Sequence, residues 1–171
     1  RDILAMRNIL SDHGEMSPFF DTVLAVNQYH NEIILRKLDH VFTDYSNLKI
    51  GFLGITYKSL TDTLKGSLTI RIGEKLIKKG AKIFAYDPLV STEKDFLLSG
   101  VKIVSSLSKC IDSMDCVVVM IEKQEFQSLN AKLISKTINQ KIILDAINYF
   151  NPEEFVSLGF KYSGIGTGIK F

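Results

Sequence analysis

The sequence lacks several features that mark particular classes of protein. Tryptophan is absent, and the only two cysteines, Cys110 and Cys116, do not form a C-x-x-C pair. Two cysteines without metal-like spacing, beside apolar neighbours, indicate core packing and a reducing cytoplasm. The three histidines, His13, His30 and His40, show no metal-ligating spacing with cysteines or carboxylates, so no metal site is predicted.

Charge and hydropathy also exclude some partners. A net charge of +2 without a polybasic run gives no reason to expect nucleic acid or an anionic membrane as partner. The longest apolar stretches, such as CVVVMI, are far too short to span a bilayer. Hydrophobic and charged fractions of 46% and 23% are ordinary for a soluble globular protein. A chain of 171 residues suffices for one packed domain plus an appendage.

The amino-terminal part predicts a long helix. After Pro18 neither glycine nor proline occurs before Asp44. Apolar residues recur there at helical spacing on one stripe, namely Val23, Ile34, Leu38 and Val41. Asn27 and His30 fall on the same stripe. Either the helix is a core helix with two tolerated polar positions, or it is an inter-domain or dimer helix whose buried asparagine fixes the register or reaches a site.

The rest of the chain has the pattern of a parallel sheet. Short, near-continuous apolar runs alternate with amphipathic segments, as expected for strands that are covered on both faces. Strands are predicted at 49–55, 81–87, 101–106, 116–121, 141–147 and 160–166, and helices at about 67–79, 91–99, 106–113, 124–137 and 152–158. We therefore expect a doubly wound α/β fold with a mainly parallel, Rossmann-like sheet of about six strands. Residues 1–46 would form a central helical region and residues 47–171 the α/β domain.

The loop after the first predicted strand is the strongest candidate for a binding site. Gly51 and Gly54 lie within that strand, so the G-x-G-x-x-G spacing of a dinucleotide site is missing. A phosphate would be met instead by Lys58 or Lys65, by serine and threonine hydroxyls, and by the amino end of the helix near Ser67. A solvated surface connection is the alternative, although loops this long after parallel strands usually carry function.

Two further polar segments admit simple interpretations. Asp87 ends the second predicted strand about 20 residues beyond Gly66, where a ribose-binding acid would lie in an NAD domain. Because Pro88 follows at once, a turn residue is an equally good explanation. The segments DSMDC and EKQEF are interpreted as solvated turns and helix starts.

Several spaced motifs, in the right order, resemble those of the UDP-glucose/GDP-mannose dehydrogenase family. GITYKSLTDTLKGS resembles the signature G-[LF]-[TAS]-[FY]-K-x-x-T-D-D-x-R-x-S, which opens the family's carboxy-terminal nucleotide-binding domain. GAKIFAYDP resembles G-A-x-[VL]-x-x-Y-D-P, and ILDAINYFNPEEFVSLGFKYSGIG resembles D-x-R-N-…-G-[FY]-x-Y-x-G-I-G. VLAVNQYH resembles the E-V-N-x-x-Q stretch of the central helix, which joins the two halves and carries the dimer contact.

The resemblance implies an NAD-dependent enzyme that oxidises the C6 alcohol of a nucleotide sugar, such as a UDP-sugar, to a uronic acid for surface polysaccharide. Arg1 and Asp2 resemble the end of the family's G-[FG]-G-G-[SA]-C-[LF]-P-K-D motif, so the nucleophilic cysteine would lie three positions before Arg1. The amino-terminal NAD-binding domain would then be absent from this chain. A homodimer is implied as well, and the chain alone would be inactive.

The resemblance also implies roles for single residues. Asp2 matches a catalytic aspartate that helps a general base or an ordered water, whereas on its own it would be interpreted as a helix cap or first-turn acid. Tyr57 and Lys58 match the [FY]-K pair that contacts the nucleotide sugar, with Lys58 neutralising diphosphate charge. Lys65 stands where the family usually has an arginine that reaches the NAD side; lysine keeps the charge but loses the two-pronged geometry.

Some positions depart from the family pattern. Ile147 replaces the arginine of D-x-R-N that contacts the UDP-sugar, and Thr167 replaces the arginine of G-I-G-R. Residues 31–33 are Asn-Glu-Ile, where many members place arginines that reach the partner's site. A non-catalytic nucleotide-binding or dimerisation module is therefore the alternative function. A generic NAD-binding Rossmann domain is a third possibility, weakened by the missing glycine pattern.

Overall fold

The computed structural model describes residues 2–93 and 100–166, and it divides into two compact units, one up to residue 36 and one from residue 37 onward. The predicted boundary lay between residues 46 and 47. Residues 37–46 fall in the second unit, where Leu38, Phe42 and Tyr45 are buried. The Tyr45 hydroxyl also donates to Asp39 over 2.7 Å within this segment.

Two helices occupy the amino-terminal part: α1 (Asp2–Asp12) and α2 (Pro18–Val41), the second of which continues into the second unit. The helix predicted from Pro18 is thus confirmed, although it ends a few residues early. Asn27 and His30 are exposed on this chain, so neither is buried among its own residues. No helix within the described ranges is long and apolar enough to cross a membrane.

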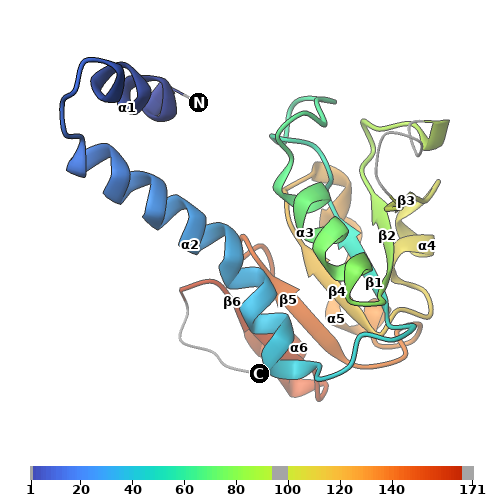
Figure 1. The fold of residues 1–171 in the computed structure, drawn as a ribbon. Coiled ribbons are helices and arrows are strands. Elements are labelled where there is room, and N and C mark those ends of the chain that lie inside the picture. Colours follow the sequence, from blue (N-terminus) through green and yellow to red (C-terminus); the bar gives the residue numbers. More distant parts are fainter. Residues whose placement is uncertain (1, 94–99, 167–171) are drawn as a thin grey trace. The chain divides into compact units, whose positions relative to one another are not determined.

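The second unit contains the predicted sheet, and Figure 1 shows its strands. Six strands lie in the order β3-β2-β1-β4-β5-β6, and every neighbouring pair is parallel. The strands are β1 (Lys49–Leu53), β2 (Lys82–Tyr86), β3 (Lys102–Ile103), β4 (Cys116–Val119), β5 (Ile142–Asp145) and β6 (Lys161–Gly164). The doubly wound, Rossmann-like fold is confirmed, and each strand is shorter than predicted, β3 most of all.

Besides the end of α2, the described part of this unit contains the helices α3 (Leu68–Lys78), α4 (Leu107–Ile111), α5 (Ala131–Ile134) and α6 (Pro152–Ser157) and the 3₁₀ helix η2 (Gln124–Ser128). The single helix predicted over 124–137 is wrong. The chain is extended at Leu129, and the Asn130 side chain accepts from the Leu133 N–H to start a new helix. Most of the helix predicted over 91–99 lies outside the described residues.

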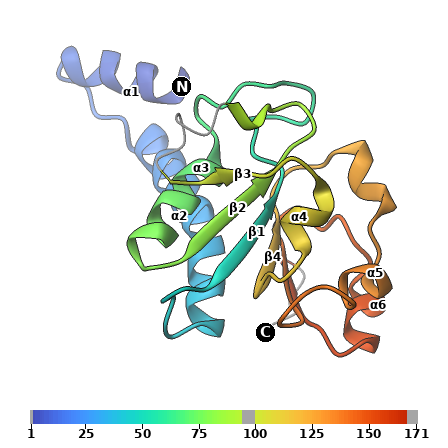
Figure 2. The same ribbon diagram turned by 90° about the vertical axis from the view of Figure 1, so that its right-hand side faces the viewer.

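Helices cover both faces of the sheet, with α3 on one side and α4, α5 and α6 on the other (Figure 2). Helix α4 approaches β1 closely, because a Cβ at Gly51 would lie 2.0 Å from the Cys110 carbonyl oxygen. Cys110 and Cys116 are free and fully buried, which confirms their predicted place in the core.

Two buried thiols and the partly buried Tyr86 predict an alkaline limit to stability. Burial raises the pKa of the Cys110 and Cys116 thiols, and burial together with the hydrogen bond to Glu125 raises the pKa of Tyr86 to about 12. The unfolded chain loses these protons at the lower, ordinary pKa values, so rising pH favours unfolding. We expect the free energy of unfolding to fall from roughly pH 9 to 12. Urea unfolding at several pH values measures this, and Tyr86→Phe should make the fall above about pH 10 shallower. A pH-independent stability would contradict the prediction.

Candidate functional site

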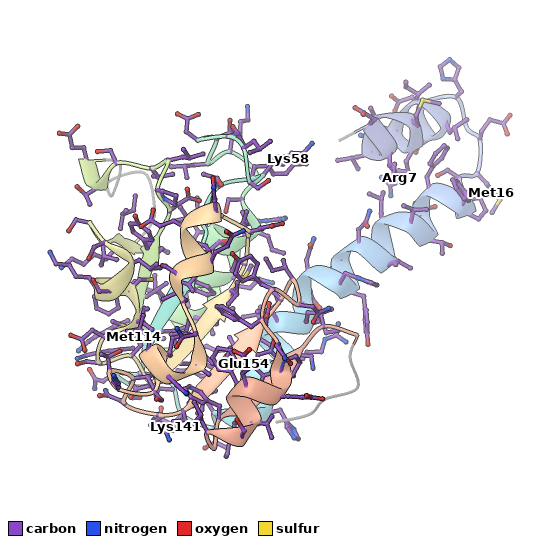
Figure 3. The ribbon with its side chains drawn as sticks, turned by 180° about the vertical axis from the view of Figure 1, so that it is seen from behind. Arg7, Met16, Lys58, Met114, Lys141 and Glu154 are labelled. Carbon is purple, nitrogen blue, oxygen red and sulfur yellow. The ribbon has the colours of Figure 1, made fainter. Side chains whose placement is uncertain are left out.

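A pocket of about 580 Å³ lies at the carboxyl edge of the sheet. It is lined by residues that follow β1, β4 and β5, namely Lys58, Ser59, Met120, Ile121, Glu122, Ile147, Asn148 and Tyr149. Figure 3 shows Lys58 on the loop that follows β1. Strands β1 and β4 are adjacent although β2 and β3 lie between them in sequence, so the pocket lies where the strand order reverses. Open α/β sheets bind ligands at this switch point.

The loop after β1, residues 54–67, starts with a close approach between strand ends. Gly54 has φ +89°, and a Cβ there would lie 2.7 Å from the Cβ of Ile121, just beyond β4. Only glycine combines that backbone conformation with that contact at little cost. The strand therefore ends at Leu53, before the predicted end at residue 55.

Buried hydroxyl groups hold the other end of this loop. The Ser67 hydroxyl donates to the Ile55 carbonyl over 2.6 Å and accepts from the Ile70 N–H as the cap of α3. The Thr69 hydroxyl donates to the Gly54 carbonyl over 3.0 Å. The loop is therefore tied together at its two ends, whereas most of residues 57–66 are exposed, as the alternative of a solvated surface connection expects. Since Ser67 and Thr69 are buried and bonded within the chain, they do not offer the hydroxyls expected for a phosphate.

Asp87 acts as a structural residue at the end of β2. Its carboxylate Oδ2 accepts from the Ile55 and Thr56 N–H groups over 3.1 and 3.2 Å, and Oδ1 accepts from the Leu89 N–H over 3.1 Å. Only 1% of the residue is exposed. A ribose could not reach this carboxylate, so of the two interpretations the turn residue is the better one.

Lys123 is the main residue that the sequence analysis missed. Its Nζ lies 3.0 Å from Asp87 Oδ1 and donates to the Thr56 hydroxyl and the Ser59 carbonyl over 3.0 and 2.8 Å. The residue is 5% exposed, so the interpretation of EKQEF as solvated is wrong here. The available signal was weak: Lys123 comes a few residues after the buried strand β4, and Asp87 directly after β2, with β1 between these two strands in the sheet.

A second buried carboxylate, Asp145, shapes the loop after β5. It accepts from the N–H groups of Ile147 and Phe150 over 3.2 and 2.9 Å and from the Tyr162 hydroxyl over 2.6 Å. Burial raises the pKa of Tyr162, and the hydrogen bond to Asp145 adds to this. Asn148 has φ 54°, a conformation that asparagine tolerates, and its side-chain N–H donates to the Ile165 carbonyl. This loop thereby brings Ile147 to the pocket.

The pocket combines opposite charges with an apolar wall. Among the described residues that line it, Lys58 is the cation and Glu122 the anion, and Met120, Ile121 and Ile147 supply apolar surface. The Tyr149 hydroxyl donates to the Lys123 carbonyl over 3.3 Å. Partial burial and the nearby Glu122 charge raise the pKa of Tyr149, so this phenol stays protonated near neutral pH.

The structure brings together only some of the residues singled out in the sequence. Lys58 and Ile147, far apart in sequence, line the same pocket, and the exposed Tyr57 is the neighbour of Lys58. Lys65 is exposed on the same loop but is not part of the pocket lining. Asp2 is exposed in the first turn of α1, in the first unit. Thr167 lies outside the described residues, and within them no group of three or more His, Cys, Asp or Glu side chains could hold a metal ion.

Comparison with known proteins identifies the family of this chain. Residues 51–152 match the model of the UDP-glucose/GDP-mannose dehydrogenase family, UDP binding domain. The UDP-glucose 6-dehydrogenase of Rickettsia bellii is 30% identical over 172 residues, which cover 99% of this chain and 40% of that enzyme. The chain thus spans about 40% of the length of this relative.

Solved structures of similar proteins show the same fold. The NDP-N-acetyl-D-galactosaminuronic acid dehydrogenase of Methanosarcina mazei superposes with a TM-score of 0.73 at 23% identity, over 88% of this chain and 32% of that one. The UDP-D-ManNAc dehydrogenase of Pyrococcus horikoshii also gives 0.73, at 24% identity, over 93% of this chain and 36% of that one. Since the family model covers more than half of its residues, the chain belongs to the UDP-glucose/GDP-mannose dehydrogenase family, with residues 51–152 matching the UDP binding domain.

Proposed function

We propose that this chain is the nucleotide-sugar-binding part of an NAD-dependent dehydrogenase that oxidises the C6 alcohol of a UDP-sugar to a uronic acid. The observation that carries the proposal is the meeting of Lys58 and Ile147 in one pocket at the switch point of the sheet. These residues belong to two motifs that are far apart in sequence. In this proposal Lys58 meets the diphosphate of the ligand, and the neighbouring Tyr57 contacts the nucleotide sugar.

The residues of this chain do not fit a dinucleotide pocket of their own. The loop after β1 lacks the glycine pattern, and the Asp87 carboxylate is buried and fully engaged. We therefore assign NAD binding mainly to the part of the relatives that this chain does not match. Lys65, exposed on the loop, is proposed to contribute a positive charge toward that cofactor.

Three further assignments belong to the same proposal. Asp2, exposed at the start of α1, would assist a general base or an ordered water when the complete site is assembled. Helix α2 would carry the contact of a homodimer, for which the exposed Phe19, Val26 and Tyr29 provide apolar surface. We expect such an enzyme to act in the cytoplasm and to supply uronic acid for surface polysaccharide.

A non-catalytic nucleotide-binding or dimerisation module is the second candidate. It is favoured by the composition of the pocket, where Ile147 occupies the position of the family's arginine and Glu122 adds a negative charge. An aliphatic side chain cannot form a charge-assisted hydrogen bond with an anionic ligand.

The full-length protein distinguishes the two candidates by NADH formation. It is assayed with UDP-glucose, UDP-N-acetyl sugars, UDP-galactose and GDP-mannose, with UDP binding measured in parallel. NADH formation with one of them supports the dehydrogenase and identifies its substrate. If none of these nucleotide sugars gives NADH while UDP still binds, the result supports the binding module. If neither NADH formation nor UDP binding is detected, both candidate functions are contradicted.

Ile147→Arg is expected to strengthen UDP binding. A guanidinium at this wall of the pocket can form a charge-assisted hydrogen bond with phosphate, which contributes about 1.5 kcal/mol, or about tenfold in affinity. Calorimetric titration with UDP measures the effect, and Ile147→Met, which keeps the wall apolar, serves as the control. Because Glu122 could capture the new guanidinium, Glu122→Gln is combined with Ile147→Arg. Unchanged affinity in both backgrounds would contradict the prediction.

A further inference from the structure

Lys123 lies in contact with the backbone of the loop that carries Lys58. We propose that Lys123 is a positioning residue, which holds the backbone on both sides of Lys58 so that the Lys58 ammonium meets the diphosphate of a nucleotide. The inference rests on the proposed function, because it assigns to Lys58 the contact with that ligand. It adds a residue from the end of β4 to a site defined by the motifs after β1 and β5.

The contacts of the Lys123 ammonium account for its whole donor capacity. An ammonium has three N–H donors, and three acceptors surround Nζ: Asp87 Oδ1, the Thr56 hydroxyl and the Ser59 carbonyl. These acceptors lie 2.8 to 3.0 Å away. Lys123 also lines a second pocket of about 550 Å³, but with its donors engaged and little of it exposed, it is poorly placed to bind a ligand directly.

Two of these acceptors flank Lys58. The Ser59 carbonyl is on the residue that follows it, and the Thr56 hydroxyl lies 2.9 Å from the Lys58 carbonyl. The Thr56 hydroxyl thus accepts from Lys123 and directs its own proton toward the Lys58 carbonyl or Asp87. The ammonium therefore restrains the chain at Thr56, two residues before Lys58, and at Ser59, directly after it.

Asp87, directly after β2, completes the set of polar contacts around Lys123, which we call the clamp. Strand β2 is the neighbour of β1, from which the loop leaves. The second carboxylate oxygen of Asp87 accepts from the Ile55 and Thr56 N–H groups, where the loop leaves β1. The ion pair therefore holds the entry of the loop through Asp87 and its middle through Lys123. Buried and fully hydrogen-bonded, such a pair specifies one backbone conformation.

Apolar packing does not fix this part of the loop. Leu60, at the tip, is 95% exposed, and Tyr57 is exposed as well. A loop held only by such residues would sample many conformations, and ordering it would cost affinity each time a ligand binds. The polar clamp orders the loop in advance, so that the flexible Lys58 side chain starts from a fixed backbone.

A double-mutant cycle on UDP affinity tests the inference. UDP is titrated calorimetrically into the unmodified chain, Lys123→Met, Lys58→Met and the double variant. We expect Lys123→Met alone to weaken binding by about fivefold and to cause no further loss in the Lys58→Met background, because it acts through Lys58. Equal losses in both backgrounds would show a structural role only and would overturn the proposal.

Thr56→Val provides a milder variant in case Lys123→Met fails to fold. It removes the hydroxyl between Lys123 and Lys58 but keeps the shape of the side chain and leaves the ion pair in place. It should also weaken UDP binding, by about threefold, and again only when Lys58 is present. Lys141→Met is the matched control, since this exposed lysine donates to the Leu158 carbonyl outside the pocket lining. UDP affinity should not change in that variant.

Hydrogen exchange separates this inference from the proposed function, because it needs no ligand. In the unmodified chain the N–H groups of Ile55, Thr56 and Tyr57 are hydrogen-bonded and should exchange slowly. Lys123→Met or Thr56→Val should speed exchange in residues 55–61 at least tenfold, and the exchange in β4 and β5 should not change. Unchanged loop exchange would overturn the clamp. Failure of the unmodified chain to bind UDP, with the exchange result as expected, would instead overturn the proposed function.

Discussion

Replacing Asp87 with alanine is expected to lower the free energy of unfolding by about 3–5 kcal/mol. The variant leaves the Lys123 ammonium buried without its counter-ion, and it removes the acceptor of the Ile55 and Thr56 N–H groups. Both partners of this ion pair are almost completely buried, with side-chain exposures of 3% for Lys123 and 0% for Asp87. Urea unfolding followed by circular dichroism near neutral pH measures the loss.

An exposed ion pair supplies the matched control. Glu32 pairs with Arg36 one turn along α2, and their side chains are 37% and 47% exposed, far more than those of the buried pair. Glu32→Ala should therefore cost no more than about 0.5 kcal/mol. The double variant with Asp87→Leu and Lys123→Met removes both buried charges and should be more stable than Asp87→Ala. A loss of under about 1 kcal/mol for Asp87→Ala would mean that the pair does not hold the loop as the geometry indicates.

Hydrophobic patterning predicted the existence of all six strands but not their ends. Ile55 and Ile121 extend their apolar runs, and both were placed in strands, yet both lie beyond the last ladder residue. The positive φ of Gly54 ends β1, and this requirement is set by the neighbouring strand end at Ile121. Tertiary contacts of this kind leave no periodic signal in the sequence of either segment.

The same limit explains which residues of the candidate site the sequence could indicate. Tyr57 and Lys58 were singled out because they belong to a spaced motif that resembles a known family. Lys123 belongs to no such motif, and its burial depends on Asp87 at the end of another strand. In a single sequence a lysine between a glutamate and a glutamine looks solvated, since unpaired charges are rarely buried. Only the strand order places the two charges side by side.

The strand order also explains the positions of the two buried carboxylates. Asp87 ends up beside the loop after β1, and Asp145 beside the loop after β5, each accepting from backbone N–H groups. Neither carboxylate is available to a ligand, because both are buried. The two buried acids thus hold the backbone of the loops, and in our proposal exposed side chains such as Lys58 contact the ligand.

Lys58→Met is expected to weaken UDP binding by about 10- to 100-fold. Hydrogen bonds with a charged partner contribute about 1.5–3 kcal/mol, and each 1.4 kcal/mol is tenfold in affinity. Lys58 is the cation among the described residues that line the pocket, so its loss leaves Glu122 to repel the diphosphate. Methionine keeps much of the apolar length of lysine, which makes the change largely one of charge.

Lys65→Met is the matched control, because Lys65 is on the same exposed loop but is assigned to the cofactor side. It should change UDP affinity by less than about twofold, since an exposed charge outside the pocket lining is screened by salt. Salt gives a second check: if Lys58 meets the phosphates, raising the ionic strength should weaken UDP binding in the unmodified chain more than in Lys58→Met. Equal UDP affinity in the two lysine variants would place the diphosphate elsewhere, and the pocket at the switch point would then lose its assignment.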